Sequence, residues 1–353
     1  MKKFFRFILL IINVAFIVAL LLSTLSGSIP PSRFVGISVL SYGYFVLLLC
    51  NVVFIIIWLC MSRWEFLFSL AAILIRCSFL PLFFQVGGTT SVEPEDTQLK
   101  VLSFNVHSFG GLDSDSLMTS NTGASQFLEL IEEEQPDVIC LQEFYQPSKV
   151  RVSDSLQARG YKYHYGVHGT SIYSQIILFS RCPIVNVQAM DEASKFYADI
   201  RKAGREVRFC CVHLDSYELT PEDHEGLEKL SHAQPDSTTH RLMRKLAVTT
   251  RNHEKEWKED LLPMIEKSRI PVVVAGDFND TPASYIYQQI TDYLSDPYVE
   301  QGRGFSTTYH GPYPAYRIDY IFHSPELPAL SYHRLKTNIS DHYPIVVQLD
   351  LAQ

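Results

Sequence analysis

Polar side chains of a few types recur at the ends of apolar runs in the second part of this 353-residue chain. A single polar residue after a strand usually caps the strand or forms a turn. Here, however, the residues are all carboxylates, amides or imidazoles, so we interpret them as parts of one site. The candidate residues are Asn105, Glu143, His213, Asp277, Asn279, Asp319, Asp341 and His342.

These residue types match the chemistry of phosphate-ester hydrolysis. Carboxylate and amide oxygens are hard ligands that suit Mg²⁺, Mn²⁺ or Ca²⁺ better than Zn²⁺. Imidazoles can donate a hydrogen bond to a phosphate oxygen or transfer a proton. Phosphodiester hydrolysis needs charge neutralisation, an activated water and in-line attack, and this set can supply all three. The seven cysteines show no metal-binding spacing.

Alternating strand-like and helix-like segments must position these side chains. Apolar periodicity predicts helices over 124–134 and 239–267, each with one apolar face. The predicted strands cover 99–106, 137–141, 174–179, 206–214, 271–275, 317–322 and 343–349. Strands with interspersed helices favour a layered α/β or α+β domain.

The beginning of the chain has a different, strongly apolar composition. Its stretches 4–25, 35–60 and 66–86 approach or exceed the ~20 apolar residues that cross a bilayer. Arg76 lies in the third stretch, where we expect it to reach the interface or to pair with another polar group. We therefore predict an anchor of about three transmembrane helices over 1–86. A linker over 87–98 and a catalytic domain over 99–353 would follow.

The distribution of basic residues predicts the orientation of this anchor. Lys2, Lys3 and Arg6 begin the chain, and Arg63 lies between the second and third stretches. With three spans, the positive-inside rule places the amino terminus in the cytoplasm and the catalytic domain outside it, at the plasma or inner membrane. The basic start is also typical of a signal peptide, but the further apolar stretches favour a retained anchor. The orientation depends on the third stretch spanning the bilayer rather than re-entering.

The net charge bears on the partners of the catalytic domain. Residues 1–98 carry six of the 30 basic and four of the 38 acidic side chains, so residues 99–353 carry 24 and 34, a net charge of -10. Such a domain has no overall attraction to polyanions, although a local basic groove would be compatible with this charge.

Seven short segments resemble one known superfamily. They are SFNVH (103–107), ICLQEF (139–144), ILFSRCPI (177–184), CVHLDS (211–216), VVVAGDFNDTP (272–282), RIDYIF (317–322) and SDHYPIV (340–346). Their order is similar to that of the endonuclease/exonuclease/phosphatase superfamily, which includes DNase I-like nucleases, abasic-site endonucleases, neutral sphingomyelinases and inositol polyphosphate 5-phosphatases. The resemblance spans 99–353 and implies a four-layer α/β sandwich, in which helices flank two packed β-sheets.

The resemblance also implies a metal centre. Glu143 would be the principal ligand, with Asn105 beside it, and Asp341 would be a second metal or water ligand. Mg²⁺ is the expected ion, with Mn²⁺ as an alternative.

The remaining site residues take catalytic roles by the same resemblance. Asp277 would orient or deprotonate the attacking water, and Asn279 would hold that water or a phosphate oxygen. His342, paired with Asp319, would contact the phosphate, and His213 would donate a second hydrogen bond to it. Which group is the base and which the acid stays open. Four other histidines are expected on the surface or in loops: His107, His164, His168 and His310.

The function expected from this site is divalent-metal-dependent hydrolysis of phosphate esters by a membrane-tethered enzyme, and the sequence does not distinguish monoesters from diesters. The substrate is a nucleic acid, a phospholipid or a small phosphodiester; the negative charge disfavours a nuclease, and the tether favours a lipid because it raises the local concentration of membrane substrates. The alternative is a catalytically silent binding module with the same fold and anchor. Substrate choice would lie in the loops 110–122, 217–239 and 295–316, and no protein partner is predicted.

Overall fold

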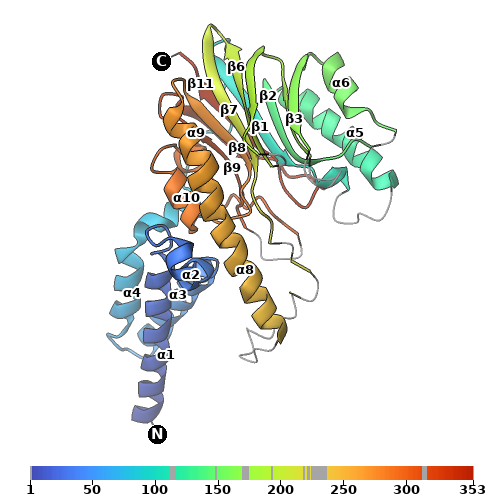
Figure 1. Ribbon diagram of the computed structural model, residues 1–353. Helices are drawn as coiled ribbons and strands as arrows, with labels where there is room; N and C mark the ends of the chain where they lie inside the picture. The colour runs from blue at the N-terminus through green and yellow to red at the C-terminus, as the bar shows by residue number, and fades with distance from the viewer. Residues whose placement is uncertain are drawn as a thin grey trace. The chain divides into compact units, whose positions relative to one another are not determined.

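The computed structural model describes residues 2–110, 117–147, 149–168, 175–191, 194–217, 219–220, 223, 237–311 and 316–352 (Figure 1). The chain forms two compact units. The first comprises Met1–Phe83, Tyr217–Trp257 and Thr281–Ile290, and the second comprises Phe84–Ser216, Lys258–Asp280 and Thr291–Gln353. Much of the loops in which we expect substrate choice lies outside the described residues, namely 111–116, 218, 221–222, 224–236 and 312–315.

The second unit contains two mixed β-sheets. The six-stranded sheet has the order β10-β11-β1-β2-β4-β3, and the five-stranded sheet has the order β5-β6-β7-β8-β9. The strands of the first sheet are β1 (Gln98–Asn105), β2 (Val138–Phe144), β3 (Tyr163–Val167), β4 (Gln175–Ser180), β10 (Ala329–Arg334) and β11 (Ile345–Asp350). Those of the second are β5 (Ile184–Ala189), β6 (Lys195–Lys202), β7 (Arg205–His213), β8 (Val272–Asp277) and β9 (Asp319–His323).

The two sheets share one buried core, and helices cover an outer face. Val101 and Cys140 of the first sheet lie in the same apolar cluster as Phe209 and Val273 of the second. On the other face of the six-stranded sheet, helices α5 (Leu117–Glu134) and α6 (Val152–Ala158) contribute to a second cluster, for example through Phe127. Two sheets packed face to face and flanked by helices confirm the predicted α/β sandwich of this unit.

One parallel pair in each sheet determines where the site can form. Strands β1 and β2 pair in parallel in the first sheet, and β7 and β8 do so in the second. The carboxyl ends of parallel strands meet at one edge, which is where ligands bind in many α/β folds. All four of these strands were predicted, because each is a short buried apolar run.

The predicted helix over 239–267 is interrupted near its end. It consists of α8 (Ser237–Glu256), a π-helical turn (Trp257–Leu261) and α9 (Leu262–Lys267). Pro263 lies in the first turn of α9. Proline has no N–H to donate and its ring conflicts with the carbonyl four residues earlier, so the wider turn before it accommodates the ring.

The first unit contains four helices from the apolar beginning of the chain. They are α1 (Lys2–Ser23), α2 (Pro31–Ser41), α3 (Tyr44–Cys60) and α4 (Phe66–Ile75). Buried polar side chains link α1, α3 and α4: Asn13 Nδ2 donates to Ser69 Oγ at 2.7 Å, Ser69 Oγ donates to Asn51 Oδ1 at 3.0 Å, and Trp58 Nε1 donates to Asn13 Oδ1 at 2.8 Å. This bundle therefore has a polar network within its interior, while many large apolar residues lie on its outer surface.

The prediction of about three transmembrane helices is wrong. Among the described residues, one helix, Lys3–Ser23, is long and apolar enough to cross a membrane by itself. The second predicted span is broken by a 52° bend between α2 and α3, at Tyr42 and Gly43. The third ends after the ten residues of α4, and a 3₁₀-helix containing Pro81 follows. The positive-inside argument counted three spans, so it no longer determines the side on which the catalytic domain lies.

Replacing Asn13 with leucine tests the polar interior of this bundle. The change removes both the acceptor of the Trp58 indole and the donor to Ser69. A buried donor left without a partner costs about 1–3 kcal/mol, so we expect the full chain in detergent to unfold at a lower temperature. Val14→Leu, at a neighbouring exposed position, serves as the control. Equal thermal midpoints for the two variants would contradict the role assigned to the network.

Candidate active site

Three predicted site residues form a row across the five-stranded sheet. His213 at the end of β7 pairs in register with Asp277 at the end of β8, and Asp277 pairs with Asp319 at the start of β9. Each is the terminal residue of its strand, so sheet register alone places the three side by side. Asp277 and Asp319 are almost fully buried.

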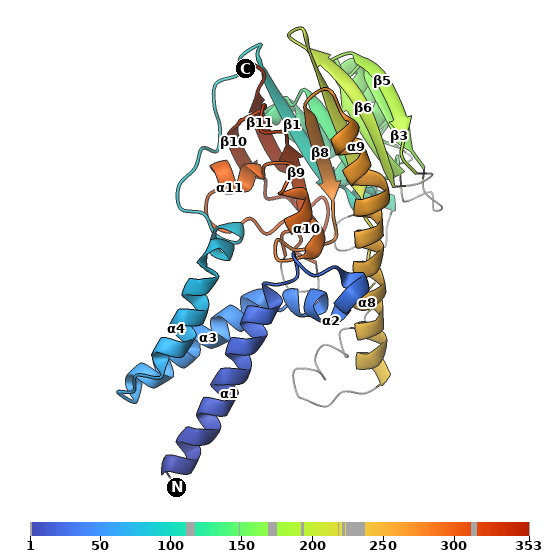
Figure 2. The ribbon, with the colours of Figure 1, turned by 60° about the vertical axis from the view of Figure 1, so that its left-hand side comes forward.

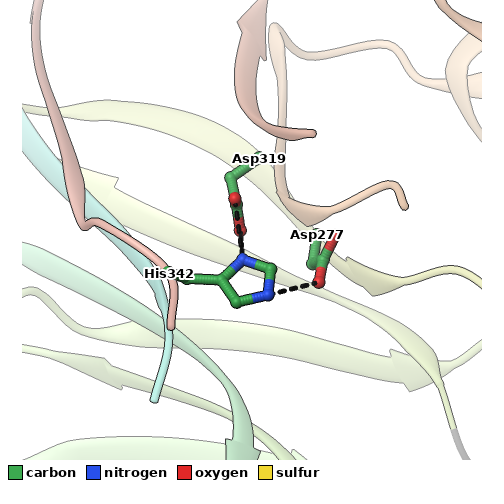
Figure 3. A group of neighbouring side chains, drawn as sticks. All are labelled: Asp277, Asp319 and His342. Carbon is green, nitrogen blue, oxygen red and sulfur yellow. Dashed lines mark hydrogen bonds and ion pairs between the residues drawn. The ribbon is translucent and has the colours of Figure 1, made fainter. Parts of the chain in front are cut away.

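The imidazole of His342 lies between the two aspartates of this row (Figure 3). Its Nδ1 is 2.9 Å from Asp319 Oδ2, and its Nε2 is 3.8 Å from Asp277 Oδ2. The backbone N–H of His342 donates to Ser340 Oγ, which fixes the loop just before β11. The ring is therefore held on one side by a hydrogen bond while its second nitrogen faces the other site residues.

The six-stranded sheet contributes the opposite side of the site. Asn105, at the end of β1, donates through Nδ2 to Glu143 Oε1 and to Asp277 Oδ2, both at 3.0 Å. His213 Nε2 lies 3.7 Å from Glu143 Oε1 and 3.8 Å from Asp277 Oδ2. The Asn105 amide thus connects the two sheets at the site.

Asn279 and Asp341 contact the site differently from the other six. The backbone N–H of Asn279 donates to Asp277 Oδ1 at 2.8 Å, but its side-chain Nδ2 donates to the Leu214 carbonyl at 3.0 Å. The carboxylate of Asp341 is 3.0 Å from Nδ1 of His107. The structure therefore gathers all eight predicted residues at or beside one site, and the individual roles assigned to them remain predictions.

Gly276 allows the two parallel strands of the second sheet to approach closely at the site. Its φ is +151°, and a Cβ at this position would lie 1.9 Å from the Val212 carbonyl oxygen. Any side chain would push β8 away from β7. Because Gly276 directly precedes Asp277, this contact fixes the position of the central carboxylate.

Burial and neighbouring charges set the protonation states of the central pair. Burial disfavours the imidazolium form of His342, but the carboxylates of Asp319 and Asp277 outweigh it and raise the pKa of His342 to about 10. Burial, with a further contribution from Asp319, raises the pKa of Asp277 above its usual value. The site therefore holds a positively charged imidazole next to a carboxylate that is more basic than a typical aspartate.

His107 lies in a turn with its side chain 42% exposed, in agreement with the expectation of a surface or loop residue, but it also contacts the site through Asp341, which the sequence interpretation did not predict. Burial of its carboxylate partner, Asp341, acts to raise the pKa of that residue. The hydrogen bond with His107 and the charge of His342 outweigh burial and lower the pKa of Asp341 to about 2. That hydrogen bond in turn raises the pKa of His107. The position of His107 two residues after Asn105, within one of the recognised segments, was a signal that could have identified it.

An unusual turn orients His107 toward the site. Three successive residues, His107, Ser108 and Phe109, have φ values of 41°, 55° and 61°. Left-handed backbone costs on the order of 1 kcal/mol per non-glycine residue, and such conformations cluster at functional sites. The backbone N–H of His107 donates to Asn105 Oδ1 at 3.1 Å, so the turn is joined directly to the site.

His107→Ala is expected to weaken metal-dependent activity without unfolding the protein. The substitution removes the hydrogen bond that orients Asp341. Losing a partner of a metal-binding carboxylate typically costs about 10–100-fold in metal affinity, so the Mg²⁺ concentration for half-maximal hydrolysis should rise by about that factor. His168→Ala, an exposed histidine outside the site, is the control. An unchanged Mg²⁺ requirement in His107→Ala would contradict the positioning role.

The donor set fits a hard divalent cation beside Glu143. Its side chain is 31% exposed, and within the described part of the chain its contacts to Asn105 and His213 involve only Oε1. Oε2 is thus available to a ligand, and carboxylate oxygens are what Mg²⁺ and Mn²⁺ prefer. A second group, Asp277, Asp319 and His342, also has ligand atoms within 4.8 Å of one another.

Comparisons with known proteins agree with this architecture. The sequence profile described as the Endonuclease/Exonuclease/phosphatase family matches residues 102–342. The chain therefore belongs to this family. Residues 3–83 match a second family, which is described as a domain of unknown function.

Individual relatives are distant but cover most of the chain. A protein of Dictyostelium discoideum named DNA-(apurinic or apyrimidinic site) endonuclease is 25% identical over 300 residues, covering 73% of this chain and 72% of that protein. An endonuclease/exonuclease/phosphatase from Bacteroides vulgatus superposes with a TM-score of 0.51 at 19% identity, covering 72% of this chain and 99% of that chain. The human Nocturnin catalytic domain with bound sulfate anion gives 0.50 at 19% identity, covering 73% and 95%.

Proposed function

We propose that this protein is a divalent-metal-dependent phosphodiesterase attached to a membrane. The observation that carries the proposal is the buried His342 ring, held between Asp319 and Asp277 opposite Glu143, Asn105 and His213. This arrangement combines a positively charged hydrogen-bond donor (His342), a carboxylate with a raised pKa (Asp277) and a carboxylate oxygen that is available to a metal (Glu143). Those three groups together match what hydrolysis of a phosphodiester requires.

Asp277 is the residue best suited to act on the attacking water. Its Oδ1 accepts the Asn279 N–H and its Oδ2 accepts the Asn105 amide, so the carboxylate is fixed in orientation. The raised pKa makes it a better proton acceptor than an exposed aspartate. A water between this carboxylate and a bound phosphate would be oriented for in-line attack on phosphorus and would lose its proton to Asp277. The ester P–O bond on the opposite side would break, and the leaving oxygen would take a proton from solvent.

The two histidines are suited to bind the phosphate. His342 donates from Nδ1 to Asp319, which leaves Nε2–H directed toward the site. His213 Nε2 approaches the same region from β7, within 3.8 Å of Asp277. Donors fixed before the reaction stabilise the charge that develops on the phosphate oxygens in the transition state.

Glu143 would hold the metal, and Asp341 would add a second carboxylate. A bound Mg²⁺ or Mn²⁺ supplies charge neutralisation at the phosphate and at the leaving oxygen. The protein side chains supply orientation, proton transfer and hydrogen-bond donors around it.

The exposed apolar surface of the first unit supports membrane attachment. Phe4 and Phe7 on α1 are 69% and 59% exposed, and Ile75 on α4 is 67% exposed. Exposed apolar surface of this extent marks a membrane or protein interface, and a buried polar network between apolar helices is typical of packing in lipid. We therefore propose that α1 crosses the membrane and that the outer faces of α3 and α4 contact hydrocarbon.

The function is tested by hydrolysis assays on the purified full chain in detergent. The panel contains abasic-site DNA, plasmid DNA, RNA, sphingomyelin, phosphoinositides and a bis-aryl phosphodiester, each with Mg²⁺, Mn²⁺ or EDTA. Abasic-site DNA is included because the Dictyostelium relative is named for it. We expect turnover of at least one phosphodiester that EDTA abolishes. A folded chain that binds metal but hydrolyses none of them would favour the silent binding module instead.

A further inference from the structure

Helix α8 has a basic outer face that the proposed chemistry does not use. His240, Arg244, Val248, Arg251 and Lys255 follow one another at helical spacing, and all five are exposed. We call these five residues the basic face of α8. Arg244 and Arg251 form no ion pair with any other described residue, so their charges are available to a partner.

The side of α8 that flanks the basic face contacts α2 of the same compact unit. The side chain of Glu254 accepts from the Ser32 N–H at 2.6 Å and from the Ser32 hydroxyl at 2.8 Å. Helices α2 and α8 lie side by side, as Figure 2 also shows. Through α2, the basic helix belongs to the same compact unit as α1, α3 and α4.

The charge of α8 contrasts with that of the chain around it. The helix contains five lysines and arginines and two glutamates, and of the five, Arg241 and Lys245 pair with Asp223, whereas the whole chain has a net charge of -8. A concentration of positive charge on one helix of an acidic protein points to an anionic partner.

Two features favour a lipid surface over a nucleic acid as this partner. Met243 and Val248 are 37% and 47% exposed among the basic residues, and a helix that mixes basic and apolar residues on its outer side is typical of the membrane interface. Helix α8 contains no phenylalanine, tyrosine or tryptophan, so it offers none of the large aromatic rings on which the bases of a single strand stack best.

We propose that the basic face of α8 binds anionic phospholipid headgroups. This inference rests on the proposed membrane attachment of the first unit, the compact unit to which α8 also belongs. Each lysine or arginine near an anionic leaflet strengthens membrane binding by about fivefold. This contact would hold the first unit at the membrane surface, in addition to the attachment that the insertion of α1 provides.

Hydrogen exchange of the full chain in lipid nanodiscs tests this contact. One set of nanodiscs contains only zwitterionic phosphatidylcholine, and the other contains roughly 30% phosphatidylglycerol, an anionic lipid. We expect amide exchange in α8 to be at least about fivefold slower in the anionic nanodiscs. The double variant Arg244→Glu/Arg251→Glu should lose this difference. The charge-matched control Lys162→Glu/Lys267→Glu, at exposed positions of the second unit, should keep it.

Three outcomes would overturn the inference, and they are distinguishable. If the full chain fails to float with liposomes, the membrane attachment itself is wrong. If it floats but α8 exchanges equally in both lipids, attachment stands and the headgroup contact is wrong. If a single-stranded DNA oligonucleotide slows exchange in zwitterionic nanodiscs while phosphatidylglycerol has no effect, the basic face is a nucleic-acid surface.

Discussion

Asp277→Asn should lower kcat for phosphodiester hydrolysis by about 10²–10⁴, the usual contribution of a general base. The substitution keeps the shape of the side chain, so Oδ1 can still accept the Asn279 N–H. It removes the negative charge and the ability to accept a proton from water. Because that loss is felt mainly in the transition state, KM should change much less than kcat.

Asp292→Asn provides the matched control for this prediction, because Asp292 is an exposed aspartate in the same unit. Steady-state kinetics on the bis-aryl phosphodiester, with the fold checked by circular dichroism, give both parameters. A variant at Asp277 that retains wild-type kcat would show that another group activates the water. A rise in KM alone would show that Asp277 only contributes to substrate binding.

His342→Gln should reduce kcat by about 10²–10³, the effect of removing one fixed donor to a developing oxyanion. Glutamine can still form a hydrogen bond but carries no positive charge next to the phosphate. His240→Gln, on the basic face of α8, is the control for a histidine outside the site. Equal kcat values for the His342 variant and the wild type would contradict the donor role.

The pairing of His342 with Asp319 also predicts the alkaline side of the pH profile. The donor role needs the charged ring, and the pKa of His342 is raised to about 10 by Asp319 and Asp277. Activity that depends on this charge is therefore complete well below pH 10 and is lost as the pH rises through that value. Asp319→Asn removes a charge that raises this pKa, so the loss should begin at a lower pH. An alkaline limb at the same pH in both proteins would contradict the assignment.

The strands that carry the site were predictable because each is a buried apolar run with a polar residue at or near one end. Four strands were missed, and three of them, β3, β5 and β10, are sheet edges. An edge strand packs less than a central one; most of β5, for instance, is exposed. Its four apolar residues are interrupted by Asn186 and Gln188, and the sequence interpretation did not recognise this pattern. The fourth, β6, alternates charged and apolar residues, and the sequence interpretation did not recognise this pattern.

The candidate site was more predictable than the apolar beginning of the chain. Most of its residues lie at or near strand ends, where the local sequence pattern predicts them. The contact of His107 with the site was not predictable in this way, because its partner Asp341 lies 234 residues away in the sequence. In the apolar beginning of the chain, hydropathy gave the lengths of the apolar stretches but did not reveal the bend at Tyr42 and Gly43. It also gave no indication that segments after residue 216 would join the apolar helices in one compact unit. Both features arise from tertiary packing, which composition and periodicity do not encode.

The most direct test of the central claim is a Mg²⁺ titration of bis-aryl phosphodiester hydrolysis by the full chain and by Glu143→Gln. Glu143 offers the carboxylate oxygen that remains available to a metal, and glutamine is a far weaker ligand of the same size. We predict saturable activation of the wild type by Mg²⁺, no activity in EDTA, and a folded variant that Mg²⁺ does not activate. Hydrolysis that persists in EDTA, or a Glu143→Gln protein with the same Mg²⁺ dependence as the wild type, would contradict the account.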